Sequence, residues 1–472
     1  MADQAWDKES TEELRKRFVY KERLVWDALD ENERRNTLAY GERYKHFLDE
    51  ARTEREAVTF IDGAARKLGF GALEERGAGY IFVNQHKSIA LVRRGRGPLS
   101  EGFRLIASHI DCPRLDLKQK PVFEAAQMAY LDTHYYGGIK KYQWVSRPLA
   151  IHGTIIREGG ERLNISIGSS PDDPVFTICD LLPHLAYKVQ ADKKLSEAIE
   201  GEKLNILAGS LPLGSEEARE RVKLGLLHLL HERYGLIEED FLSAELEAVP
   251  AEPARDVGLD RSLVGAYGQD DRACAYAALE ALLADTDPRL WAAGFFLDKE
   301  EIGSDGATGA KSRFLETVVL ALLADNGLAT GPADVYRLLG KSRCISADVA
   351  GAMDPHWKEV YEERNVARLG YGPCISKYTG SRGKYGASDA SAEFLGWLRR
   401  TLNAAGTIWQ TGELGKVDEG GGGTVAKDLA VYGMEIIDMG TPVLSMHSPF
   451  EVASKADLYM TYKVLRAFLE AD

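Results

Sequence analysis

The chain has 472 residues, of which 44% are hydrophobic and 28% are charged, and this composition excludes a chain that is disordered along its whole length. Its 59 basic and 73 acidic residues give a formal net charge of −14, spread along the chain, so a nucleic acid is not an expected partner. No stretch approaches the roughly 18 uninterrupted apolar residues of a transmembrane helix, and no membrane association is expected.

The amino-terminal half is predicted to change from helices to strands. Apolar residues recur at helical spacing within the first 70 residues, in the segments 24–51 and 54–70. Short apolar runs then predict three strands, at 80–85, 88–94 and 103–111. Residues 115–253 show the alternating runs typical of antiparallel strands, so they are predicted to form a β-rich insertion.

After Pro253, predicted strands and helices alternate. The strands are expected at 291–297, 344–350 and 433–440, and the helices at 271–285, 313–325, 388–406 and 456–471. This alternation is typical of a mostly parallel sheet with helices on both faces. We therefore predict an α/β fold in which residues 1–114 and 254–472 form one domain with a mostly parallel central sheet flanked by helices. Residues 115–253 form the inserted β-rich domain.

The cysteines and the amino terminus indicate a cytoplasmic protein. The five cysteines are odd in number and widely scattered: Cys112, Cys179, Cys274, Cys344 and Cys374. They predict no disulfide framework, and without a CxxC pair they predict no thiolate zinc cluster. The first 18 residues are charged and lack the apolar core of a signal peptide.

Potential metal ligands follow several of the predicted strands. They are His109 and Asp111, Glu300 and Glu301, Asp348, and His447, while Asp270 and Asp271 precede a helix. Taken singly, each has an ordinary structural explanation: an aspartate before a helix can be its N-cap, and a glutamate pair can lie in a solvated loop. Because the carboxyl ends of parallel strands meet at one sheet edge, we expect these side chains to converge there.

The residue types at this edge suit a pair of divalent cations. Imidazole and carboxylate ligands bind zinc, manganese or cobalt. A two-metal hydrolase needs one carboxylate that contacts both ions, which lie roughly 3.5–4 Å apart. We assign Asp270 to that bridge, His109 and Asp348 to one ion, and Glu301 and His447 to the other.

Two carboxylates are predicted to act beside the ions. Glu300 and Glu301 are adjacent and point in different directions, so one can bind metal while the other faces the attacking water. Glu300 is predicted to take the proton of that water and to give it to the leaving amine. Asp111 shares a strand face with His109, so it can hold the second nitrogen of that imidazole.

Five motifs, in order and spacing, resemble the M18 metallo-aminopeptidases, which include aspartyl aminopeptidase and vacuolar aminopeptidase I: SHIDCP, GQDDRACAYAALEAL, DKEEIGS, SADVAGAMDP and VLSMHSPFE. The resemblance covers roughly residues 80–460. It implies a di-zinc exopeptidase domain, an inserted dimerisation domain, and a tetrahedral dodecamer built from dimers with enclosed active sites. It also implies Glu300 as the general base, Asp111 behind His109, and five metal ligands: His109, Asp270, Glu301, Asp348 and His447.

The chain departs from the family pattern at four places. The usual HTDSP is HIDCP at 109–113, and the usual LDN is Gln269-Asp270-Asp271. Both histidines of the DMAHAxHP pattern are absent from 348–355, and a Cys-Gly-Ser-Thr run is replaced by GGGT at 421–424. These departures remove no predicted ligand. They separate the chain from the aspartyl branch and indicate the bacterial aminopeptidase 1 branch, and the preferred N-terminal residue stays open.

Three further residues are assigned to the substrate through the resemblance. His184, in Leu-Pro-His-Leu at 182–185, matches a family loop whose histidine enters the active site of a neighbouring subunit, and the alternative is an auxiliary metal ligand. Lys377 resembles the substrate lysine of the family. Tyr385 matches its tyrosine only if one residue is inserted.

The leading function is removal of the N-terminal residue from peptides, with two zinc ions, or cobalt or manganese, as cofactors. Glu300 or Glu301 can supply the carboxylate that recognises the free α-amine. An alternative keeps the metals and changes the substrate, as in carboxypeptidases and N-acyl amino acid deacylases. A catalytically silent assembly protein would lack a ligand or the base, and here all six positions are filled.

Overall fold

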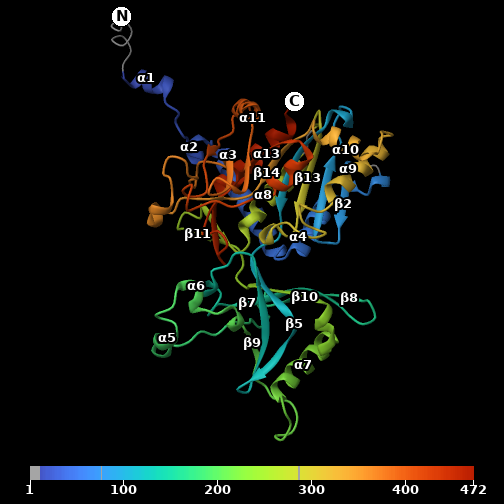
Figure 1. Ribbon diagram of the computed structural model, residues 1–472, viewed down its shortest axis with the longest axis vertical. Coiled ribbons are helices and arrows are strands. Elements are labelled where there is room, and N and C mark those ends of the chain that lie inside the picture. The colour runs from blue at the N-terminus through green and yellow to red at the C-terminus, as the bar shows by residue number, and fades with distance from the viewer. Residues whose placement is uncertain (1–10, 76, 285–286, 472) are drawn as a thin grey trace, which may run out of the picture.

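The structure is a computed structural model that describes residues 11–75, 77–284 and 287–471. The first ten residues, which belong to the charged amino-terminal segment, lie outside the described residues. Two bodies follow one another along the long axis of the molecule, as Figure 1 shows. Among the described residues, no helix is both long enough and apolar enough to cross a membrane.

The larger body is built on a nine-stranded sheet with the order β1-β2-β3-β13-β4-β14-β20-β16-β19. Its four inner strands, β13, β4, β14 and β20, are parallel to one another. The predicted mostly parallel sheet is thereby confirmed, with antiparallel pairing between β2 and β3, between β3 and β13, and between β16 and β20. The strands are β1 (Phe70–Gly71), β2 (Gly79–Asn84), β3 (Ser88–Arg93), β4 (Phe103–His109), β13 (Trp291–Leu297), β14 (Arg343–Ala347), β16 (Cys374–Ser376), β19 (Gln410–Thr411) and β20 (Glu435–Gly440).

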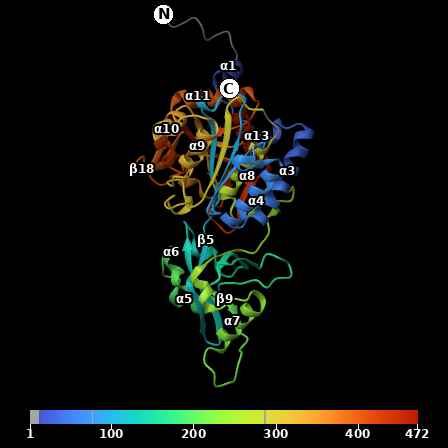
Figure 2. The same ribbon diagram turned by 90° about the vertical axis from the view of Figure 1, so that its right-hand side faces the viewer.

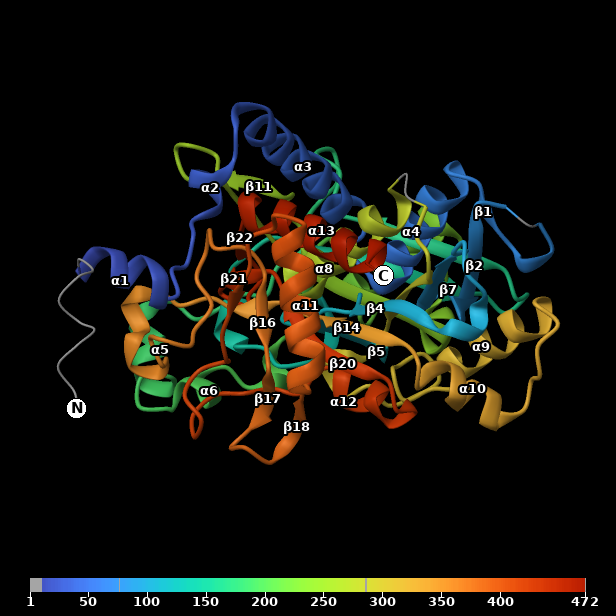
Figure 3. The ribbon, with the colours of Figure 1, turned by 90° about the horizontal axis from the view of Figure 1, so that it is seen from above.

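Helices cover both faces of this sheet, as expected for an α/β fold. Viewed from above, α3 and α13 lie on one side of the strands and α9, α10 and α12 on the other (Figure 3). The helices that pack on the first face are α3 (Glu31–Glu50), α4 (Glu54–Lys67), α8 (Gln269–Leu283), α11 (Ala392–Ala404) and α13 (Lys455–Glu470). The helices that pack on the second face are α9 (Phe314–Asp325), α10 (Pro332–Leu339) and α12 (Ala426–Leu429). The inner strands are apolar toward both faces: Ile106 of β4 packs into the first core and Leu105 into the second.

The smaller body is a six-stranded antiparallel sheet with the order β8-β7-β10-β5-β6-β9. Its strands are β5 (Arg114–Ala125), β6 (Met128–Tyr136), β7 (Leu149–Ile156), β8 (Arg162–Ile167), β9 (Ile206–Gly209) and β10 (Ala244–Pro250), and its helices are α5 (Pro183–Val189), α6 (Leu195–Ala198) and α7 (Arg221–Tyr234). It has a hydrophobic core of its own. Strand β5 enters the smaller body from the larger one, and the chain returns to the larger body after β10. The two bodies are also distinct in the view turned by 90° (Figure 2).

Short elements complete the larger body. They are α1 (Thr11–Phe18), α2 (Val25–Ala28), the sheet of β11 (Arg255–Val257), β12 (Leu263–Ala266), β15 (Ala350–Gly351), β21 (Pro442–Leu444) and β22 (Glu451–Ser454), and the hairpin of β17 (Tyr378–Ser381) and β18 (Tyr385–Asp389). The helix expected at 388–406 begins only at Ala392. Ser391 is its N-cap, since its hydroxyl accepts a hydrogen bond from Phe394 N, and residues 388–389 belong to the hairpin.

Candidate metal centre

Side chains of the types that bind metal ions gather at the carboxyl edge of the central sheet. His109 ends β4, and Asp348 directly follows the neighbouring parallel strand β14. Glu300 and Glu301 lie in a short turn after β13, which flanks β4 on its other side. Because these three strands run parallel, their carboxyl ends bring the four side chains together.

Two more members of the cluster come from outside these strands and share one support. Asp270 lies at the start of α8, where its backbone (φ −83°, ψ 110°) is not yet helical. His447 lies in the loop between β21 and β22. The buried carboxylate of Glu451, the first residue of β22, accepts hydrogen bonds from the backbone N–H groups of Asp270 (3.1 Å) and His447 (2.7 Å). Glu451 therefore fixes these two residues relative to each other.

The side chains form two groups that share Asp270. The first group is His109, Asp270 and Asp348, and the second is Asp270, Glu301 and His447; within each, the ligand atoms lie within 4.8 Å of one another. Oδ1 of Asp270 is 3.1 Å from Nε2 of His109, while its Oδ2 is 3.1 Å from Nε2 of His447. Each carboxylate oxygen of Asp270 thus faces a different histidine.

Asp111 lies behind the first group. Nδ1 of His109 donates to the backbone carbonyl of Asp111 at 3.0 Å and lies 3.4 Å from the carboxylate Oδ1. The same buried carboxylate accepts the backbone N–H groups of Glu300 (3.1 Å) and Glu301 (3.2 Å). Asp111 therefore orients the imidazole of His109 and also holds the turn that carries both glutamates.

The electrostatics of the cluster favour a cation. Burial raises the pKa of Glu301 well above its usual value, and the neighbouring Asp270 raises it further. Burial likewise raises the pKa of Asp348. Burial would also raise the pKa of Asp270, but hydrogen bonds from His109 and His447 outweigh it and lower that pKa. Buried carboxylates gathered at this density are stabilised by positive charge, and a divalent cation supplies it.

A buried carboxylate oxygen without a hydrogen-bond partner also indicates a metal site. Oε1 of Glu301 is buried and makes no hydrogen bond with any residue that the structure describes, although Nε2 of His447 lies 3.4 Å away. A buried carboxylate oxygen without a donor is costly, and coordination of a cation removes that cost. Imidazole nitrogens and carboxylate oxygens are the ligands that zinc accepts in proteins.

The cluster opens into a cavity of about 920 Å³. Asp270, Glu300, Glu301, Asp348 and His447 line one side of it. The hairpin of β17 and β18 and the glycine run 420–423 also line the cavity. A small molecule or the end of a chain that enters this cavity meets the carboxylates directly.

A family model for the aminopeptidase I zinc metalloproteases (M18) matches residues 47–469. The chain belongs to the M18 family. A probable M18 family aminopeptidase 1 from Clostridium acetobutylicum is 46% identical to it over 457 residues, which are 94% of this chain and 97% of that relative. It is thus an enzyme of a zinc metallo-aminopeptidase family, and the resemblance seen in its five motifs is confirmed.

Solved structures of M18 proteins share the fold. The crystal structure of an M18 aminopeptidase from Thermotoga maritima superimposes with a TM-score of 0.92 at 47% identity and covers 96% of this chain and 99% of that one. One chain from the structure of the Saccharomyces cerevisiae mApe1 dodecamer superimposes with a TM-score of 0.74 at 21% identity, over 92% of this chain and 97% of that one. At that identity the likeness is one of fold alone.

The three residues that the M18 resemblance assigns to substrate lie apart from the cluster. His184 is on the exposed helix α5 of the smaller body, and no residue of 115–253 lines the cavity. Lys377 directly precedes β17, and its Nζ donates to the hydroxyl of Tyr378 at 2.8 Å. Tyr378 lines the cavity, whereas Lys377 and the exposed Tyr385 do not.

Sequence reasoning missed the supports of this M18 centre. Glu451 stands in the VLSMHSPFE motif, four residues after His447, and this spacing is the one sequence feature that could have identified it. Tyr136 contacts Asp111, and Gly138 contacts His447, from the smaller body. No sequence motif identifies these two residues, because the partners lie as far as 309 residues away in the chain.

Proposed function

We propose that this chain removes N-terminal residues from peptides with two divalent metal ions, Zn²⁺ in the first instance, with Co²⁺ and Mn²⁺ as suitable substitutes. The observation that carries the two-ion proposal is the placement of Asp270, whose two carboxylate oxygens face two different histidines. His109 and Asp348 hold one ion with Asp270, and Glu301 and His447 hold the other. When bound, the ions polarise the scissile carbonyl and lower the pKa of water.

Glu300 is the proposed general base. It belongs to neither ligand group, yet it lines the cavity beside Glu301 and Asp270. Burial raises the pKa of its carboxyl above the usual value, the direction that makes a carboxylate a stronger base. Its carboxylate takes a proton from the attacking water and later passes it to the amine that leaves.

Recognition of a free α-amine distinguishes this function from that of a deacylase or carboxypeptidase. An ammonium group at the end of a peptide pairs with a carboxylate of the cluster, and Glu301 and Glu300 both face the cavity. Lys377 and Tyr385 are proposed to contact the substrate, since Lys377 precedes and Tyr385 belongs to the hairpin of β17 and β18, which lines the cavity.

The expected result with substrates is hydrolysis of aminoacyl-arylamides that carry a free amine. Their N-acetylated counterparts should be resistant, because acetylation removes the positive charge that the carboxylates recognise. The assay uses acidic, basic and aliphatic arylamides with zinc, cobalt and manganese, and chelator-treated protein is the control. Faster cleavage of the N-acetylated compounds would favour a deacylase, and release of C-terminal residues from peptides would favour a carboxypeptidase.

We further propose that the smaller body, residues 115–253, mediates self-association in the cytoplasm, with dimers assembling into a dodecamer. Its helix α5 and the residue before it expose Leu182 (50%), Leu185 (57%) and Tyr187 (80%) around His184. Apolar side chains grouped in this way are typical of an interaction surface. The proposal places His184 in the cavity of a neighbouring subunit, as a substrate contact or an auxiliary metal ligand.

Mixing two inactive variants tests this sharing. Glu300→Gln and His184→Ala, reassembled together, should regain activity, because a mixed dimer has one site with both residues intact. Each variant alone should stay weak while keeping the oligomer size of the wild type in light scattering. No recovery of activity in mixed oligomers, or a fully active monomer in sedimentation, would contradict the shared site.

A further inference from the structure

Both candidate histidine ligands are held from behind, and the smaller body takes part in each case. Nδ1 of His447 donates to the backbone carbonyl of Gly138 at 3.0 Å. A carbonyl only accepts, so Nδ1 carries a proton in this contact, and Nε2 is the nitrogen that faces Asp270 and Glu301. Gly138 comes just after β6, the strand of the smaller body that ends at Tyr136.

Tyr136 reaches the second histidine through Asp111. Its hydroxyl donates to Oδ2 of Asp111 at 2.8 Å. Asp111 in turn lies behind His109 and accepts the backbone N–H groups of Glu300 and Glu301. A single hydroxyl therefore steadies the carboxylate on which one proposed ligand and the proposed base both depend.

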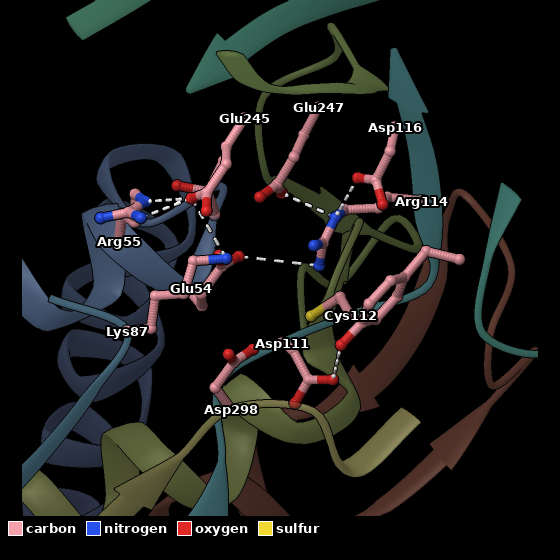
Figure 4. A network of polar contacts seen from close by, with 12 residues as sticks. Glu54, Arg55, Lys87, Asp111, Cys112, Arg114, Asp116, Glu245, Glu247 and Asp298 are labelled. Atoms are coloured by element: carbon pink, nitrogen blue, oxygen red, sulfur yellow. Dashed lines mark hydrogen bonds and ion pairs between the residues drawn. The ribbon is translucent and has the colours of Figure 1, made fainter. Parts of the chain in front are cut away.

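The ring of Tyr136 is itself fixed by Arg114. The two residues are directly opposite each other in the pairing of β5 with β6, and the guanidinium lies 3.8 Å from the centre of the ring. Nε of this buried arginine pairs with Asp116 at 2.8 Å and with Glu247 at 3.1 Å. Figure 4 shows Arg114 held among these acids and Glu54, with Asp111 close by.

We propose that the segment Tyr136–Gly138 of the smaller body is a positioning element for the metal centre of its own chain. It orients His447 through the Gly138 carbonyl and orients His109, with the turn of Glu300 and Glu301, through the Tyr136 hydroxyl. Between them, Gly137 has φ 74°, a left-handed conformation that favours glycine and turns the chain toward His447. The proposal rests on the proposed function, and it differs from the role of His184, which concerns a neighbouring subunit.

The hydroxyl is tested with Tyr136→Phe, which keeps the ring over Arg114. We expect the zinc dissociation constant, measured by competition with a chromophoric chelator, to rise about tenfold or more, the scale seen when the partner of a metal-binding histidine is perturbed. The value of kcat should fall by about the same factor, while KM changes less than about twofold. The matched control is Tyr267→Phe: Tyr267 is a buried tyrosine whose hydroxyl donates to the Pro113 carbonyl at 3.1 Å. It should retain the wild-type zinc affinity.

The placement of His447 against Gly138 is tested with Gly138→Ala, which keeps the carbonyl but adds a Cβ 3.2 Å from Nδ1 of His447. The imidazole must then shift, and we expect zinc affinity and kcat to fall about tenfold. The matched control is Gly209→Ala in β9 of the same body, where a Cβ would meet no atom within 4 Å.

Measurements on the variants and on the wild type distinguish a failure of the positioning role from a failure of the proposed function. The positioning role is contradicted if Tyr136→Phe and Gly138→Ala keep the zinc affinity and kcat of the wild type, even if their melting temperatures fall. It is also contradicted if the control variants lose as much zinc affinity as the test variants. A wild-type protein that binds no zinc or cleaves no peptide would overturn the proposed function, and this inference with it.

Discussion

Glu300→Gln is expected to lower turnover by about 10²-fold or more while leaving the zinc content near that of the wild type. Glutamine is similar in size to glutamate and cannot accept the proton of the attacking water. The turn should persist, because Asp111 holds it through the backbone N–H groups of residues 300 and 301, which the substitution retains. Kinetics on an aminoacyl-arylamide and elemental analysis of the same preparation measure the two quantities.

Glu301→Gln is the matched comparison for this prediction. Glu301 belongs to the second ligand group, with a buried Oε1 that faces His447, so its loss should lower zinc occupancy as well as turnover. The assignment of the base would be wrong if Glu300→Gln remained active. Equal loss of zinc in the two variants would also contradict it.

Asp270→Asn should leave at most one tightly held metal per chain and almost no hydrolysis. The substitution removes the negative charge of the carboxylate whose two oxygens face the two histidines, and two cations a few ångströms apart would then repel each other with less screening. The amide also offers one oxygen instead of two. Elemental analysis after extensive dialysis gives the number of ions retained.

The adjacent Asp271→Asn provides the control for the bridge. Asp271 is fully buried but belongs to neither ligand group, so this variant should retain two ions. Two tightly bound ions in Asp270→Asn would mean that another carboxylate forms the bridge. Loss of one ion in Asp271→Asn alone would point to Asp271.

The sequence predicted the edge at which the site forms better than it predicted the contacts within it. Strand ends were sufficient for His109, Asp348 and Glu301, because parallel strands finish at one edge whatever their loops do. The start of α8 was less predictable. A helix was expected from residue 271, yet it begins at Gln269, and Asp270 and Asp271 inside it depart from helical backbone angles.

The supports of the site could not be predicted because they depend on tertiary structure. Gly138 acts through its carbonyl group, which every residue has, and Tyr136 is useful only because β6 ends beside Asp111. Glu451 accepts the backbone N–H of His447, four residues before it, but it supports the site only because it also accepts the N–H of Asp270, 181 residues away. Such contacts appear only when strands far apart in the sequence are placed together.

The central claim is that two metal ions share Asp270, and anomalous diffraction at the zinc edge from crystals of zinc-loaded protein tests it most directly. The account predicts two peaks per chain, roughly 3.5–4 Å apart, one beside His109 and Asp348 and the other beside Glu301 and His447, with Asp270 between them. A single peak at full zinc loading, or two peaks without Asp270 between them, would contradict it.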